Sequence, residues 1–137
     1  MLFFMEMLPP TVTHQEKRVA VRGGKPVVYE DDRLKDARAK LTAYLMQHKP
    51  EKPAQGAISL RVQWLFLDNT KHHQHGEFRT TKPDTDNLQK LLKDCMTNVG
   101  FWNDDAQVAV EHVVKRWVRQ HPGILIEVEN ANAVEQV

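Results

Sequence analysis

Residues 58–67 read Ile-Ser-Leu-Arg-Val-Gln-Trp-Leu-Phe-Leu and carry the clearest structural signal in the chain. Apolar and polar side chains alternate at first, and the segment then ends as an apolar run. This pattern is typical of a β-strand that becomes buried on both faces. We therefore predict a strand here, central in its sheet at its far end, and the other elements are arranged around it.

Two helices are predicted, one before and one after this strand. From Glu30 to about His48 and from Asp84 to Val99, apolar residues recur in steps of three and four. Gly100 is suited to end the second helix. The apolar stripe of that helix is narrow and consists of Leu88, Leu91, Leu92, Cys95 and Val99.

The remaining strands are short. Residues 1–8 are expected to form a short, mostly buried strand, and Gly23-Gly24 to close a hairpin between two valine-containing strands. The segments around 108–117 and 124–128 are predicted to pair as another hairpin. Together these elements predict an α+β fold with a small mixed β-sheet packed with two main helices. We expect a single domain over residues 1–130, followed by a polar C-terminal tail at 131–137.

Composition excludes several classes of protein. The chain has 137 residues, 41% of them hydrophobic and 27% charged, which is typical of one globular domain and not of a disordered chain. A net charge of +1 excludes a histone-like basic protein but not local concentration of positive charge. No apolar run is long enough to span a membrane, and the short apolar start has no preceding basic region. With a lone Cys95 as well, we expect a cytoplasmic protein without a membrane partner.

The polar face of the second helix carries the first candidate site. With Leu88 centred on the buried side, Asp86, Lys90, Lys93 and Thr97 project from the opposite face. Asp84 falls at the N-cap, where the bend of the chain can turn its carboxylate towards the same point as that of Asp86. Taken alone, these residues are more typical of an ordinary N-cap and a surface ion pair than of a functional site.

A second acidic element, Asp104-Asp105, follows the helix. Alone it is typical of a turn, because aspartate side chains bond their own backbone. A tight turn after a helix of this length can return the next strand to the neighbourhood of the helix. Three carboxylates without thiolate partners suit Mg²⁺ or Mn²⁺, and a nearby lysine suits a phosphate substrate.

These residues also form an ordered pattern. The run Lys82-Pro83-Asp84-Thr85-Asp86-Asn87-Leu88-Gln89-Lys90 is followed by Asp94 and then by Gly100-Phe101-Trp102-Asn103-Asp104-Asp105-Ala106-Gln107-Val108. This pattern resembles the signature of the RusA-type Holliday-junction resolvases, and a weaker match of strand and helix order extends over most of the chain.

The resemblance implies a small, symmetric homodimeric endonuclease that cuts four-way DNA junctions with Mg²⁺, for which Mn²⁺ may substitute, and no organic cofactor. It implies that Asp84, Asp86 and Asp105 are catalytic, metal-binding aspartates and that Lys90 is the essential lysine, with Asp104 a weaker match. It also implies a role in DNA recombination and repair, and resolvases of this family are often carried by phages and prophages.

Further cations and a histidine are expected to contact DNA. They are His14, Lys17, Arg18, Arg79, Lys82 and Lys93. The aromatic or arginine residues that some family members carry just before the first aspartate are absent here, where residues 80–83 read Thr-Thr-Lys-Pro. The histidines of residues 72–75 are more typical of a solvated loop than of a zinc site.

Two alternatives remain open from the sequence. One is a nuclease that uses the same site but prefers flaps or forks. The other is a catalytically inactive, junction-binding architectural protein.

Overall fold

The computed structural model describes residues 1–13 and 17–135. Four strands form one mixed sheet in the order β1-β6-β4-β5. They are β1 (Leu2–Glu6), β4 (Ile58–Leu67), β5 (Val108–Val118) and β6 (Gly123–Asn130). β4 lies in the middle, parallel to β5 and antiparallel to β6, and β1 pairs antiparallel with β6 at one edge. The prediction of a central strand is confirmed for residues 58–65, which pair with a strand on each side. Its far end is neither central nor buried on both faces, because Phe66 and Leu67 pair with β5 alone and Leu67 is 37% exposed.

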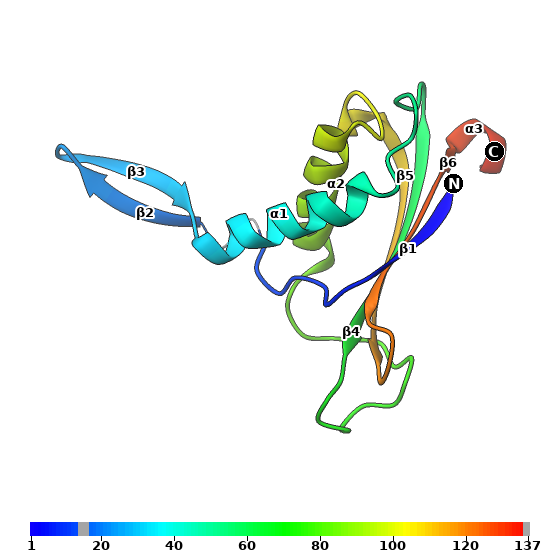
Figure 1. The fold of residues 1–137 in the computed structure, drawn as a ribbon, viewed down its shortest axis with the longest axis horizontal. Helices are drawn as coiled ribbons and strands as arrows, with labels where there is room; N and C mark the ends of the chain where they lie inside the picture. Colours follow the sequence, from blue (N-terminus) through cyan, green and yellow to red (C-terminus); the bar gives the residue numbers. More distant parts are fainter. Residues whose placement is uncertain (14–16, 136–137) are drawn as a thin grey trace.

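Two helices, α1 (Asp32–Met46) and α2 (Thr85–Val99), lie on the same side of this sheet (Figure 1). Their apolar stripes pack against the inward side chains of β4, of which Leu60, Val62 and Trp64 are almost fully buried. α2 ends at Gly100, which adopts a φ of 107°, a conformation that favours glycine. The expected α+β fold, a small mixed sheet with two main helices, is confirmed.

The predicted hairpin between the last two strands is wrong. β5 and β6 are consecutive in the chain, but β4 lies between them and pairs with both. The segment from β4 through α2 to β5 is a crossover, and a crossover of this length returns the chain parallel to the strand it left. Alternation of side chains therefore identified each strand but not its neighbour.

The two ends of the chain also differ from the expectation. β1 is shorter than residues 1–8, and only alternate residues are buried: Phe3 and Met5 face the core, while Leu2 is 63% exposed. Since helices cover only one face of the sheet, a strand at its edge has only one buried side.

Residues Ala131–Val134 form a short helix, α3, and Ala131 is buried. A boundary between domain and tail near residue 130 stays a prediction.

A separate two-stranded hairpin, β2 (Lys17–Arg22) and β3 (Lys25–Glu30), projects away from the sheet and helices (Figure 1). The predicted turn is confirmed: Gly23 and Gly24 have φ values of 57° and 77°, as required by the tight turns that join adjacent strands. Val19 and Val21 on β2 remain exposed. In the parts of the chain that the structure describes, no helix has the length and apolarity needed to cross a membrane.

Candidate active site

Asp84 occupies the N-cap of α2, but its carboxylate does not cap the helix. Its backbone is extended, with φ of −75° and ψ of 151°, and its side chain accepts no hydrogen bond from the first turn. Asp31, at the N-cap of α1, shows the ordinary arrangement, because its carboxylate accepts a 2.8 Å hydrogen bond from the backbone N–H of Arg33. The carboxylate of Asp84 is thus left exposed for another use.

A hollow of about 370 Å³ lies between α2 and the chain that follows it. Asp86 and Lys90, one helical turn apart, line it from α2, and Asp105 lines it from the short 3₁₀ helix η2 (Asp105–Gln107). Lys93 lies on the same wall. The structure therefore brings together residues that the sequence placed on one helix face and in a later turn. Asp84 does not line this hollow and lies at the beginning of the helix beside it.

The position of Asp105 is set by a tightly bonded turn. The side-chain oxygen of Gln107 accepts hydrogen bonds from the N–H groups of Asn103 and Asp104, at 2.9 and 3.0 Å. The amide nitrogen of Gln107 donates to the carbonyls of Ala54 and Gly56, at 3.0 and 3.1 Å, which ties the turn to the chain before β4.

The two neighbouring aspartates have different tasks. Asp104 caps η2, because its carboxylate accepts a 2.8 Å hydrogen bond from the N–H of Ala106. Asp105 makes no such bond and faces both the hollow and a second depression on its other side. This division fits the expectation that Asp105 is the functional residue of the pair.

Comparison with known proteins identifies the family. A family model described as endodeoxyribonuclease RusA matches residues 8–129. The chain belongs to the RusA family. It is 31% identical over 107 residues to a protein of Lactococcus phage r1t named crossover junction endodeoxyribonuclease, covering 77% of this chain and 79% of that one. It is 26% identical over 132 residues to YqaN of Bacillus subtilis, covering 89% and 92% of the two chains. With crossover junction endodeoxyribonuclease RusA of Escherichia coli K12 it shares 59% identity over 32 residues, 27% of that protein. The expectation of a RusA-type endonuclease, an enzyme that hydrolyses DNA, is confirmed.

Two residues of the RusA site were missed by the sequence analysis. Gln89 is buried, and Glu111 on β5 lines the hollow. The indole N–H of Trp64 donates to Gln89 Oε1 at 2.7 Å, and Gln89 Nε2 donates to Glu111 Oε2 at 2.8 Å. The other carboxylate oxygen of Glu111 pairs with Lys93 Nζ at 3.2 Å.

This chain of contacts fixes the direction of every hydrogen bond in it. An indole nitrogen can only donate, so the oxygen of the Gln89 amide must face Trp64 and its nitrogen must face Glu111. Glu111 is thereby held in the acceptor role and keeps the ammonium of Lys93 in place. A signal for Gln89 was present in the sequence, because it continues the buried ridge of Leu92 and Met96 in steps of three and four.

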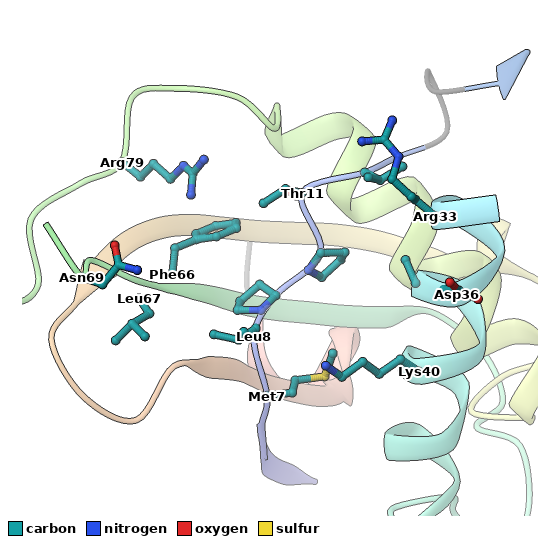
Figure 2. A pocket seen from close by; sticks show the side chains of 14 residues that line it. Met7, Leu8, Thr11, Arg33, Asp36, Lys40, Phe66, Leu67, Asn69 and Arg79 are labelled. Carbon is teal, nitrogen blue, oxygen red and sulfur yellow. The ribbon is translucent and has the colours of Figure 1, made fainter. Parts of the chain in front are cut away.

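The cations expected to contact DNA are distributed unevenly. Lys82 is exposed just before Asp84, and Lys93 lines the hollow. The guanidinium of Arg79 is engaged elsewhere: it lies over the rings of Phe66 and Trp117, which are neighbours on β4 and β5. Arg79 and Phe66 also line a cavity of about 510 Å³ (Figure 2). His14 lies outside the described residues, and the side chains of Lys17 and Arg18, on β2, are likewise not described.

The residues of the RusA hollow suit a divalent cation by their chemistry. Asp86 and Asp105 face it with oxygen ligands only, which hard cations such as Mg²⁺ prefer. Over residues 1–13 and 17–135, the carboxylates of Asp84, Asp86 and Asp105 form no hydrogen bond or ion pair with another side chain. Within those same residues, no three His, Cys, Asp or Glu side chains lie close enough together to enclose a metal ion.

Proposed function

We propose that this RusA-family protein is a divalent-metal-dependent endonuclease that resolves four-way DNA junctions by paired nicks. The observation that carries the proposal is the meeting of Asp86, Asp105 and Lys90 in one hollow, in a chain that matches the RusA family over residues 8–129. The names of its phage and Escherichia coli relatives, both crossover junction endodeoxyribonucleases, support the choice of a junction as substrate. DNA recombination and repair is the process in which such a substrate arises.

The three aspartates have a common task in this proposal. Asp84, Asp86 and Asp105 hold Mg²⁺, for which Mn²⁺ substitutes, and no organic cofactor is involved. When bound, the cation supplies an activated water and neutralises charge on the scissile phosphate. The exposure of all three carboxylates, and the lack of a capping bond at Asp84, support this use.

The lysines act on the phosphate itself. Lys90 is exposed and lies one turn after Asp86, so its ammonium reaches the phosphoryl oxygens on which charge builds up in the transition state. Lys93, held by Glu111, binds a neighbouring phosphate. Lys82, next to Asp84, and the residues His14, Lys17 and Arg18 are proposed to contact the arms of the junction.

A homodimer completes the proposal. Resolution of a junction requires one nick in each of two opposing strands, and a two-fold symmetric pair of identical sites matches the symmetry of that task. Each copy of the chain then supplies one hollow and cuts one strand.

The test is a comparison of four substrates. The purified protein is incubated with Mg²⁺ and a synthetic four-way junction, a flap, a fork or a linear duplex, with Asp105→Asn prepared in parallel to detect contaminating nucleases. We expect symmetric nicks in the junction and little cleavage of the duplex. Preferred cleavage of flaps or forks would establish the alternative nuclease specificity. Tight junction binding without cleavage of any substrate would establish an architectural protein.

A further inference from the structure

The backbone directly before Asp84 is held by two cations. The ammonium of Lys115, on β5, donates to the carbonyls of Thr81 and Pro83, at 2.8 Å each. The guanidinium of Arg79 donates to the carbonyl between them, that of Lys82. Three successive carbonyl groups therefore bind side chains that come from outside the helix. Such bonds to charged donors are stronger than those between neutral groups.

Arg79 is itself immobilised. Its guanidinium carbon lies 4.2 Å from the ring centre of Phe66 and 4.4 Å from that of Trp117. Figure 2 shows the side chain extending from its loop above Phe66. The backbone N–H of Arg79 donates to the carbonyl of Lys115 at 2.9 Å, so the two cations share one anchor on β5. An arginine that lies over two neighbouring rings in this way has little freedom to reach a phosphate.

Lys115 is partly enclosed in the same place. Burial lowers the pKa of its ammonium, the charge of Arg79 lowers it further, and the charge of Asp84 raises it. Both donor contacts of Lys115 go to backbone carbonyls within the protein, so its charge is directed at the loop and not at the solvent.

The backbone carbonyl of Asp84 accepts a 3.1 Å hydrogen bond from the N–H of Leu88 in α2, but the side chain of Asp84 is not fixed by the helix. Its carboxylate forms no capping bond with the first turn of α2, so the location of the side chain follows from the backbone at residues 81–84. Pro83 is buried and leads directly into the helix. A shift of the loop would move the Asp84 carboxylate relative to Asp86 and Asp105, which are fixed by the helix and by η2.

We infer that Lys115 and Arg79 are positioning residues for Asp84: by binding the carbonyls of residues 81–83 they fix the backbone that presents its carboxylate beside the hollow, from which it contributes to binding the divalent cation, without contacting DNA themselves. The inference rests on the proposed function, because it requires that Asp84 is a metal ligand. It assigns Arg79 a different role from the DNA contact expected from the sequence. A positioning role predicts that loss of the side chain lowers metal affinity and cleavage rate, whereas a DNA contact predicts that it lowers junction affinity.

The test compares Lys115→Met with the wild-type protein in three measurements. Single-turnover cleavage of a four-way junction should slow by at least about tenfold, because small displacements of catalytic groups have effects of that order. The affinity for Mn²⁺ without DNA, measured from the electron paramagnetic resonance of free ion, should fall severalfold. Junction affinity in metal-free buffer, and its dependence on salt, should stay at the wild-type level. Lys115→Arg, which keeps the charge and the donors, should recover part of the rate and of the Mn²⁺ affinity.

Arg116→Met is the matched control. Arg116 is the next residue on β5, and it also binds a carbonyl of the same loop, that of Gly76, at 2.9 Å, while it stacks on Phe78. It therefore resembles Lys115 in strand, loop and type of contact, but its carbonyl lies well before Asp84 in the chain. Arg116→Met should keep the wild-type rate and Mn²⁺ affinity, even if its melting temperature falls as much as that of Lys115→Met.

Two results would overturn the inference. One is a Lys115→Met protein with wild-type rate and Mn²⁺ affinity. The other is a loss of rate matched by an equal loss of junction affinity and a smaller salt dependence, which would make Lys115 a phosphate contact.

If Lys115→Met does not fold, Lys115→Gln, which keeps one donor, is judged by the same measurements. Asp84→Asn distinguishes failure of the proposed function from failure of the positioning role. Wild-type activity in Asp84→Asn would refute the role of Asp84 as a metal ligand. An inactive Asp84→Asn together with an unaffected Lys115→Met would refute only the positioning role of Lys115.

Discussion

The indole nitrogen of Trp64, in the centre of β4, lies 2.7 Å from the side-chain oxygen of Gln89 on α2, and both residues are buried. The bond joins the core of the sheet to the helix that carries Asp86 and Lys90. Because Gln89 also donates to Glu111 at the hollow, a contact in the core determines how a charged residue at the site is held.

Replacement of Gln89 should lower the free energy of unfolding, because it removes the hydrogen bond between Gln89 and Trp64. Gln89→Leu leaves the Trp64 indole N–H buried without an acceptor, which should lower the free energy of unfolding by about 1–3 kcal/mol. Trp64→Phe removes the donor, so Gln89→Leu should cost less in that background. Urea unfolding of the wild-type protein, both single variants and the double variant measures the coupling, expected at about 0.5–3 kcal/mol. Additive effects would show that the bond contributes nothing to stability.

Asp86→Asn should abolish cleavage while the fold stays intact. Asp86 is exposed on the face of α2 opposite the buried stripe, so its replacement should cost less than about 1 kcal/mol of stability. The amide has nearly the same shape but lacks the charge needed to hold a divalent cation. In metal-free buffer the loss of one negative charge near the phosphodiester should leave junction binding equal or tighter. Nicking assays, gel-shift titration and a thermal melt of one protein preparation check all three expectations, and wild-type nicking would reduce Asp86 to an ordinary first-turn acid.

Lys90→Ala should lower the rate of cleavage far more than the affinity for the junction. One cation among many contributes little to binding, whereas stabilisation of charge in the transition state depends on its position. Lys35→Ala, on the exposed side of α1, serves as the control for a general loss of positive charge. Equal losses of affinity and of single-turnover rate in Lys90→Ala would assign this lysine to phosphate anchoring.

The choice of metal should follow from the oxygen-only donors. Mg²⁺ and Mn²⁺ should support cleavage, while Ca²⁺ should allow junction binding with little turnover, because its larger and more flexible coordination positions water poorly. Titration of each ion in the nicking assay, alongside gel shifts, measures the difference. Full activity in excess chelator would contradict the metal-dependent mechanism.

Acid should loosen the loop between β4 and α2 only at the low pH at which the Asp68 carboxylate is protonated. Hydrogen bonds, chiefly from the Thr70 side chain and also from the N–H groups of Thr70 and His73, lower the pKa of Asp68 to about 2. Since the pKa of the folded state is depressed, this contribution to stability is complete above the unfolded value of about 3.9 and is lost as pH falls through about 2. Asp68→Asn should lose the contribution at neutral pH. Acid titration followed by the fluorescence of Trp117, which stacks on His73 of this loop, compares the two proteins, and identical profiles would contradict the assignment.

Local patterns in the sequence predicted most of the elements but not all of their partners. Periodicity identified β4 and both long helices, and Gly23-Gly24 identified the projecting hairpin, because these signals depend on residues close together in the chain. The neighbour of β5 was predicted wrongly, because the parallel partner is separated from it by the whole of α2 and the turn that follows.

The residues of the candidate site were likewise predicted where the signal is local in the chain and missed where it depends on distant contacts. Asp86 and Lys90 follow from helix phase alone, and their meeting with Asp105 in one hollow was expected from the shortness of the turn. Glu111 was missed because its position is defined by contacts with Gln89 and Lys93 across two elements, which no local pattern reveals. The charge of Arg79 and its closeness to Asp84 in the chain suggested a DNA contact, but the stacking on Phe66 and Trp117 shows that its guanidinium is already engaged.

The parallel pairing of β4 with β5 has a consequence for the chain during its synthesis. When α2 has left the ribosome, Asp84, Asp86 and Lys90 exist, but Asp105 and the strand that completes this side of the sheet do not. Non-local pairing of this kind forms only after the intervening chain is complete. An unfinished nascent chain therefore carries three of the four proposed catalytic residues but lacks the turn and the strand that would align them with Asp105. The proposed catalytic site can therefore form only after synthesis has passed β5.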